Sequence, residues 1–206
     1  MKNLGLAFAA VFLFMASFSA PAKTAEPAKT VCVEHALRAE VYYGIPRGLL
    51  LSIALVESGY EGGPWPWTLN IDGKGYHLDS REDALARMVD ESGDLRRNMA
   101  VGCMQIYTNY HADRFSSPER ILDPRYNVWY GGWFLSDLYK RYGSWLEAVG
   151  RYHANNPDDQ RAYTCRVLRH RIRLGYQTLN PAAERLCSGR YRAELTGAST
   201  AATSRQ

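Results

Sequence analysis

The chain has 206 residues, of which 46% are hydrophobic and 22% are charged, and its formal net charge is +4. These values are typical of a folded soluble domain, and they exclude a disordered, a collagen-like and a histone-like chain. The length leaves room for one core of moderate size.

The first 22 residues have the features of a secretory signal peptide. Lys2 precedes a charge-free apolar run from Leu4 to Phe18, and Ala20-Pro21-Ala22 then fits the small-residue pattern that a signal peptidase cleaves. The alternative is a membrane anchor, but a span needs about 20 apolar residues and this run is shorter. We therefore expect an exported protein that works in the periplasm, with residues 23–30 as a flexible lead-in.

Two helices are predicted at the start of the mature chain. Apolar residues recur at helical spacing from Val31 to Tyr43, and Gly44 ends the run. Pro46 suits the first turn of a second helix that continues to Ser58-Gly59. Because this second helix is apolar on nearly all sides, it should lie in the core.

The helical pattern breaks over residues 60–79, where a short hairpin is predicted around the turn Asp72-Gly73-Lys74-Gly75. Ser80-Arg81-Glu82-Asp83 resembles a capping box for a helix through about Val89. Further helices are expected near residues 124–142, 144–154 and 158–174. The polar tail, residues 188–206, is expected to be disordered.

The four cysteines allow three disulfide pairings in an exported protein. Cys32 starts the fold, whereas Cys165 and Cys187 lie near its end, so a bond between the two ends is a plausible pairing. Cys103 lies in an apolar segment and is interpreted as a small buried side chain. Because no C-x-x-C spacing occurs, no zinc site is predicted, and we expect neither a metal nor another cofactor.

Glu57 is the most informative single residue. With Leu50, Ile53 and Ala54 it follows the i, i+3, i+4, i+7 pattern, so its carboxyl group continues the apolar stripe of the second helix. Burial and the negative end of the helix dipole should both raise its pKa, as a general acid requires. The alternative is an ordinary Glu at the mouth of the core that pairs with an Arg.

Two later segments hold polar groups in apolar surroundings. Val101-Gly102-Cys103-Met104-Gln105-Ile106 carries one amide, Gln105, which in a cleft could bind a sugar or an acetamido group. In the predicted helix 144–154, Tyr152 shares one face with three apolar residues, so it is either a core anchor or a hydroxyl group beside the catalytic acid.

In this order, the three clusters resemble the soluble lytic transglycosylases, which are goose-lysozyme-like murein lyases. The family pattern has a helix ending in Glu-Ser, then a Gly-Leu-Met-Gln motif and then an Ala-Tyr-Asn-Ala-Gly motif. The corresponding segments here are Val56-Glu57-Ser58-Gly59, Gly102-Cys103-Met104-Gln105-Ile106 and Val149-Gly150-Arg151-Tyr152-His153-Ala154, in which Tyr152 stands at the Tyr of the last motif. The resemblance implies a mainly α, lysozyme-like α+β domain with a small β-hairpin insert, over residues 31–187. Cys103, His153 and Asn155 depart from the family pattern.

The resemblance also implies the roles of the site residues. Glu57 would be the sole catalytic acid and base, Gln105 a substrate-contacting amide, and Tyr152 the hydroxyl group that positions Glu57. Ser58, Met104 and His153 complete the expected substrate-binding set. His153 is the most open of these assignments, because a single His beside a cleft is more often structural.

The implied reaction cleaves the bond between N-acetylmuramic acid and N-acetylglucosamine and closes a 1,6-anhydro ring without water. Asp72, Asp79 and Glu61 are candidates for a second carboxylate, although nothing in the sequence fixes their distance from Glu57. The aromatic rings of the insert (Tyr60, Trp65, Trp67 and Tyr76) either form a wall of a glycan groove or bury the insert against the domain.

Two other functions are left open by the sequence: a murein hydrolase of lysozyme type, and a non-catalytic murein-binding component of an envelope secretion or conjugation machine. The expected partner is the peptidoglycan glycan strand, and the expected oligomeric state is a monomer. The basic stretch from Arg166 to Arg173 is interpreted as a solvated helix face, so no nucleic-acid partner is predicted.

Overall fold

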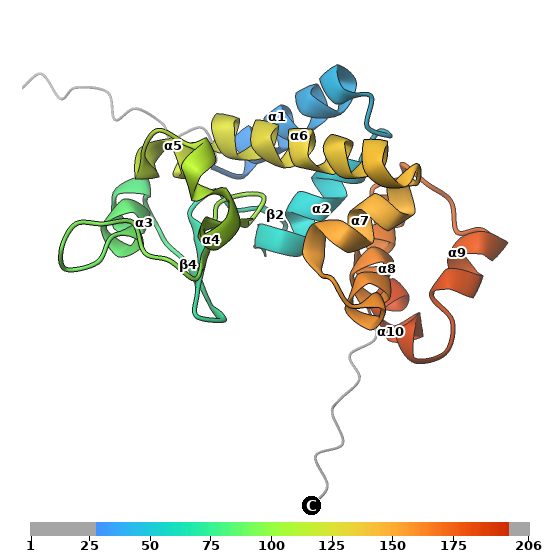
Figure 1. The fold of residues 1–206 in the computed structure, drawn as a ribbon. Coiled ribbons are helices and arrows are strands. Elements are labelled where there is room, and N and C mark those ends of the chain that lie inside the picture. Colours follow the sequence, from blue (N-terminus) through green and yellow to red (C-terminus); the bar gives the residue numbers. More distant parts are fainter. Residues whose placement is uncertain (1–27, 198–206) are drawn as a thin grey trace, which may run out of the picture.

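A computed structural model describes residues 28–197 (Figure 1). The expected signal peptide, residues 23–27 of the lead-in and residues 198–206 of the tail lie outside the described part. Within residues 28–197, no helix combines the length and the hydropathy needed to cross a bilayer.

Five long helices form the body of the molecule. α1 (Ala28–Tyr43) packs along α6 (Pro124–Tyr142), and α2 (Leu49–Ser58) runs beneath them through the centre (Figure 1). α7 (Trp145–His153) packs between α6 and α8 (Pro157–Arg173), and α8 also packs on α2. The shorter helical segments are α3 (Arg81–Met88), α4 (Thr108–His111), η1 (Ala112–Arg114), α5 (Pro118–Leu122), α9 (Pro181–Leu186), η2 (Gly189–Tyr191) and α10 (Arg192–Thr196).

The predicted long helices are confirmed to within about three residues at each end. Their ends follow local capping chemistry: the Ser80 hydroxyl group accepts a hydrogen bond from the Asp83 amide at the start of α3. Gly143 ends α6 in the left-handed conformation, with φ of 72°. The elements form the mainly helical α+β architecture, with small antiparallel sheets, that the resemblance implies.

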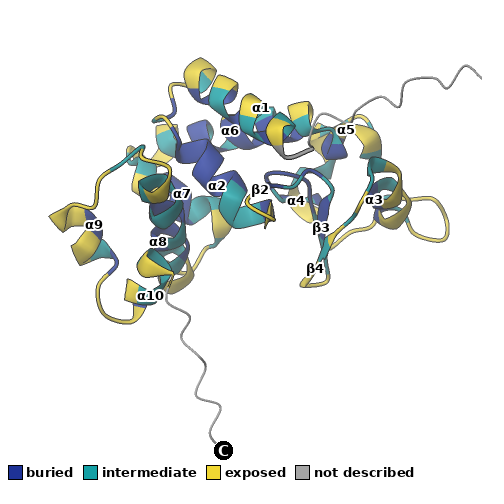
Figure 2. Cartoon of the chain, turned by 180° about the vertical axis from the view of Figure 1, so that it is seen from behind, coloured by how far each residue is buried: buried dark blue, intermediate teal, exposed yellow. Residues whose placement is uncertain are grey.

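α2 is the central core helix, and Figure 2 shows it as buried over most of its length. It begins at Leu49, so the expectation that Pro46 lies in its first turn is wrong. The reason is a cap from another helix: the buried carboxylate of Glu40 accepts hydrogen bonds from the amides of Gly48 (2.7 Å) and Leu51 (3.1 Å). Gly48 itself has a φ of 77°, which a helix cannot continue through.

The strands lie on the opposite side of the molecule from α8. β3 (Thr68–Ile71) and β4 (Lys74–His77) form the predicted hairpin, and the antiparallel sheet continues through β5 (Met99–Val101) to β6 (Ile106–Tyr107) in the order β4-β3-β5-β6. A second, two-stranded sheet pairs β1 (Gly59–Tyr60) with β2 (Gly63–Pro64), directly after α2. The chain therefore turns from the end of α2 straight into the strand region.

The disulfides are Cys32–Cys103 and Cys165–Cys187, so the expected bond between the two ends of the fold is wrong. Cys103 is buried as expected, but it is also bonded. The first bond links α1 to the segment between β5 and β6, and the second closes a C-terminal loop around a small separate cluster of buried side chains. Sequence spacing carries no information on which of these distant segments meet in space.

The tail is the other correction to the expected organisation. Residues 189–196 are helical (η2 and α10), and α10 packs against α8. Tyr191 provides the reason, because its ring is 8% exposed and its hydroxyl group donates a hydrogen bond to Asp158 at the start of α8 (2.6 Å). The polar composition of residues 188–206 predicted disorder because it gave no sign that Tyr191 is buried.

Candidate active site

A cavity of about 690 Å³ lies between the helical and the strand regions. Its helical wall comes from the ends of α2 and α7 and from Phe134 of α6, and its opposite wall comes from the strands and α4. The polar side chains in these walls include those of Glu57, Gln105, Tyr107, His111, Tyr152 and His153. Among the described residues that line it, Glu57 is the only carboxylic acid.

Glu57 lies in the last turn of α2 with its side chain 14% exposed. Burial raises the pKa of its carboxyl group from an ordinary 4.5 to about 7, while the hydrogen bond from Tyr163 and the positive charge of Arg166 act in the opposite direction. Near neutral pH a substantial fraction is therefore protonated. Such a group can donate a proton and afterwards accept one.

Tyr163 of α8 holds Glu57 in place, and sequence reasoning missed this residue. Its hydroxyl group donates a hydrogen bond to Glu57 Oε1 at 2.6 Å, and the residue is fully buried. Burial and the neighbouring Glu57 raise the pKa of Tyr163 well above its ordinary value, so the phenol stays neutral. One signal was present: Tyr163 and Val167 share the apolar face of the predicted helix, and a buried tyrosine hydroxyl group needs a partner.

Tyr152 does not make the contact expected of it. Its hydroxyl group donates a hydrogen bond to the carbonyl oxygen of Met104 (3.0 Å) instead of to Glu57. Tyr152 lines the cavity, and the charge of Glu57 contributes to its raised pKa, so the two side chains are near neighbours. The hydroxyl group therefore fixes the segment between β5 and β6 against α7.

His153 lies beside Glu57 and Tyr163. Its ring stacks on Tyr163 with 4.2 Å between centroids and 4° between planes, and its Nδ1 lies 3.9 Å from Glu57 Oε1. Burial, followed by the charge of Arg166, lowers the pKa of His153 below its ordinary value. The neutral ring thus covers one face of the tyrosine that holds Glu57.

Gln105 is held in the opposite wall by an unusual backbone conformation. Its φ is 46°, and its side-chain nitrogen donates hydrogen bonds to the carbonyl oxygens of Thr68 (3.1 Å) and Gly102 (2.9 Å). Within the described part of the chain, both hydrogen bonds of this amide use its nitrogen. Its oxygen is left as an acceptor for a ligand.

The turn before Gln105 depends on a buried asparagine. The side chain of Asn127 donates hydrogen bonds to the carbonyl oxygens of Val101 and Ile121 and accepts one from the Met104 amide. Gly102 has a φ of 76°, and a Cβ atom there would lie 2.7 Å from Asn127 Nδ2. Only glycine fits this position without displacing the amide.

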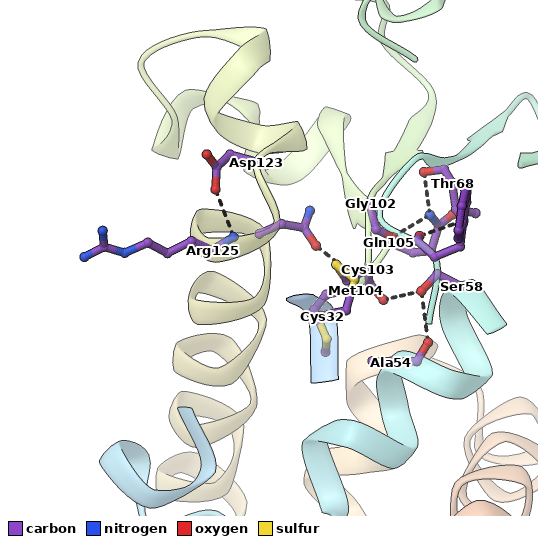
Figure 3. Close-up of a disulfide and its surroundings, with 12 residues drawn as sticks. Cys32, Ala54, Ser58, Thr68, Gly102, Cys103, Met104, Gln105, Asp123 and Arg125 are labelled. Atoms are coloured by element: carbon purple, nitrogen blue, oxygen red, sulfur yellow. Dashed lines mark hydrogen bonds between the residues drawn. A yellow bond between two sulfur atoms is a disulfide. The ribbon is translucent and has the colours of Figure 1, made fainter. Parts of the chain in front are cut away.

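Ser58 and Met104, which were expected to contact substrate, are not among the described residues that line the cavity. Ser58 is 1% exposed, and its hydroxyl group donates hydrogen bonds to the carbonyl oxygens of Cys103 and Ala54 (Figure 3). Met104 is fully buried beneath α6, where Gly131 leaves room for it. Both residues join α2 and α6 to the segment that carries Gln105.

The aromatic rings of the insert agree better with the second expectation than with the first, because Trp67 packs against the main hydrophobic core and so buries the insert against the domain. Among the described residues that line the cavity, none is Asp72, Asp79, Glu61 or one of the four aromatic residues of the insert. Trp65 donates its ring N–H to the Leu78 carbonyl oxygen, and Tyr60 stacks on His77, so these rings pack the insert internally. The strand wall of the cavity instead comes from Asn70, Asn98 and Tyr107.

Comparison with known proteins gives one match. The family described as the Transglycosylase SLT domain matches residues 34–164, which is well over half of the chain. This range includes Glu57, Gln105, Tyr152, His153 and Tyr163. No curated protein and no solved structure matches the chain.

Proposed function

The chain belongs to the transglycosylase SLT domain family, whose members act on murein, and from this premise we propose that it is an exported lytic transglycosylase. Its proposed substrate bond is the β-1,4 bond from N-acetylmuramic acid to N-acetylglucosamine. The proposed product is a glycan end that carries 1,6-anhydro-N-acetylmuramic acid.

The observation that carries the proposal is the single carboxylic acid of the cavity. Most glycosidases use two carboxyl groups, one as an acid and one as a base or nucleophile. Glu57 has no such companion among the described residues of the cavity wall. A reaction in which one carboxyl group acts first as acid and then as base fits this arrangement better than a two-carboxylate hydrolysis.

The proposed reaction has two proton transfers. Glu57 donates its proton to the glycosidic oxygen as the bond to C1 of the muramic acid breaks, and the acetamido oxygen of the same sugar stabilises the positive C1. The Glu57 carboxylate then removes the proton of the C6 hydroxyl group while O6 bonds to C1. The ring closes, Glu57 regains its proton, and no water is consumed.

The surrounding residues serve these two steps. The hydrogen bond from Tyr163 orients Glu57 and prevents its pKa from rising further. His153 supports the ring of Tyr163 by stacking on it. Gln105 offers its amide oxygen to the substrate from the opposite wall, and Tyr152 fixes the segment that carries Gln105.

Export is the second part of the proposal. Residues 1–22 would be removed as a signal peptide, and residues 31–187 would form the catalytic domain, against which the helical residues 189–196 pack. The protein would act as a monomer in the periplasm. Two disulfides are compatible with an oxidising compartment.

The test is digestion of purified murein in oxygen-18 water, followed by mass spectrometry of the released fragments. We expect 1,6-anhydro ends that are lighter by one water than hydrolysed ends and that contain no oxygen-18. Labelled reducing ends would establish hydrolysis and refute the proposed chemistry. Glu57→Gln is the matched control, because the amide keeps the shape but cannot donate the proton, and we expect its cleavage rate to fall by about a hundredfold or more.

The same variant separates an enzyme from a binding protein. If parent and Glu57→Gln release no fragments while both bind murein, the chain is a non-catalytic murein-binding component. If they differ in cleavage but bind equally, the assignment of Glu57 stands.

A further inference from the structure

A second hollow, of about 410 Å³, lies on the surface of α6 outside the catalytic cavity. Tyr126, Trp129, Tyr130 and Trp133 line it from α6, at the i, i+3, i+4, i+7 spacing of one helix face. Tyr43 at the end of α1 and Phe115 before α5 add two further rings. We call this set the aromatic hollow.

The aromatic hollow contains rings that are partly exposed to solvent and rings that pack against one another. Trp133 is 39% exposed and Tyr126 is 37% exposed, although large aromatic side chains tend to be buried. The ring of Tyr130 lies 5.2 Å from that of Trp133 and 5.0 Å from that of Phe115. The rings therefore form a prearranged surface whose binding costs little side-chain entropy.

The charge of the aromatic hollow is positive. Arg114 and Arg120 also line it, no acidic residue does so among the described residues, and Arg120 lies over the Tyr126 ring at 4.2 Å. Within residues 28–197 neither guanidinium group forms an ion pair with a carboxylate. The hollow thus suits a ligand that combines apolar faces with carboxylates.

The aromatic hollow adjoins the catalytic cavity. The Tyr130 hydroxyl group and His111 Nδ1 are hydrogen bonded at 2.8 Å, and His111 lines the catalytic cavity. Phe134, the neighbour of Trp133 in sequence, also lines that cavity. A polymer bound in the cavity therefore has a second surface within reach, separated by one layer of side chains.

We propose that the aromatic hollow is a secondary binding site for the murein strand, outside the catalytic cavity. Flat faces of the sugar rings would stack on Trp133 and its neighbours, and carboxylates of the peptide stems would bind Arg114 and Arg120. This inference rests on the proposed murein substrate, but not on the lyase chemistry. The site would hold the enzyme on the insoluble polymer between cleavage events.

The test measures binding to insoluble murein in the inactive Glu57→Gln background, so that no cleavage occurs. Adding Trp133→Ala and Arg120→Ala together should lower the affinity for murein about tenfold. This is within the range for truncating aromatic and Arg side chains that become buried in a complex. Matched controls are Leu179→Ala and Arg192→Ala, which truncate exposed side chains away from the hollow and should leave affinity unchanged. Trp133→Tyr, which keeps a ring, should retain most of the binding.

Two further measurements make the outcome decisive. In the active background, turnover of a short soluble murein fragment should be unchanged by Trp133→Ala and Arg120→Ala, while release from whole murein should fall. On murein stripped of its peptides, Arg120→Ala should lose its effect and Trp133→Ala should keep it.

Unchanged affinity of the double variant for whole murein would overturn the proposal, and would be the expected result if the hollow binds another protein. An equal loss of turnover on short and polymeric substrates would also overturn it, because the variants would then have disturbed the cavity. If labelled ends show that the enzyme hydrolyses murein, only the proposed chemistry fails, since the binding measurement is independent of it.

Discussion

The raised pKa of Glu57 implies that this carboxyl group, the proposed catalytic acid, destabilises the fold above its unfolded-state pKa, and this destabilisation can be measured. Between pH 4.5 and about 7 the native state keeps the Glu57 proton while the unfolded chain loses it. The unfolding free energy therefore falls as pH rises through this interval, by about 1.4 kcal/mol per pH unit. Over 2.5 units the loss is about 3 kcal/mol.

Glu57→Gln removes this loss. Its side chain is nearly isosteric with a protonated Glu and can still accept the hydrogen bond from Tyr163. We expect the variant to match the parent within about 1 kcal/mol at pH 4.5 and to be about 3 kcal/mol more stable at pH 8. Denaturant unfolding of both proteins at several pH values gives the difference, in which groups common to both proteins cancel.

Glu34 on α1 provides the control for this comparison. Glu34→Gln removes an acid that is 48% exposed on α1, and its effect on stability should stay within about 0.5 kcal/mol at every pH. A constant difference between Glu57→Gln and the parent from pH 4.5 to 8 would show that Glu57 is not desolvated in the native state.

Three further predictions concern the hydrogen bond to Glu57, the turn before Gln105 and the disulfide of Cys32. Tyr163→Phe removes the hydrogen bond that lowers the pKa of the catalytic carboxyl group, so the alkaline limb of the pH-rate profile should move to higher pH, and an unmoved limb would contradict the assigned contact. Gly102→Ala should lower the unfolding free energy by roughly 2 kcal/mol or more, because its Cβ atom would lie 2.7 Å from Asn127 and the backbone has a positive φ; thermal denaturation measures the loss. Non-reducing peptide mapping should find Cys32 bonded to Cys103, and replacing both with Ser should cost about 4 kcal/mol by the chain-entropy model; any other bonded partner for Cys32 would refute the pairing.

The sequence was sufficient to predict features that depend on local periodicity. The helix boundaries followed from apolar spacing and from residues such as Ser80 and Gly143, whose effects act within one turn. The burial of Glu57 was predicted by the same rule, since its position on the apolar stripe of α2 needs no knowledge of distant segments. The raised pKa of Glu57 could therefore be predicted from the sequence.

Features that depend on distant contacts could not be predicted in the same way. Tyr163 is 106 positions from Glu57, and nothing local distinguishes it from Tyr152 as the partner of that carboxyl group. The disulfide partner of Cys32 could not be predicted for the same reason, because Cys103 is 71 positions away in the sequence. Ser58 is a further example, because the sequence shows that a hydroxyl group lies next to Glu57 but not that this group donates hydrogen bonds to the carbonyl oxygens of Ala54 and Cys103 inside the protein.

The bond between Cys32 and Cys103 also makes the covalent bracing of the site depend on the redox state of the compartment. Cys103 lies two residues before Gln105, and its carbonyl oxygen accepts the hydrogen bond from Ser58, next to Glu57. In a reducing compartment the thiols stay unbonded, so the wall that carries Gln105 lacks its covalent anchor to α1. Under the proposed export, a newly made chain would therefore acquire its covalently braced site only in the oxidising compartment that also holds its proposed substrate.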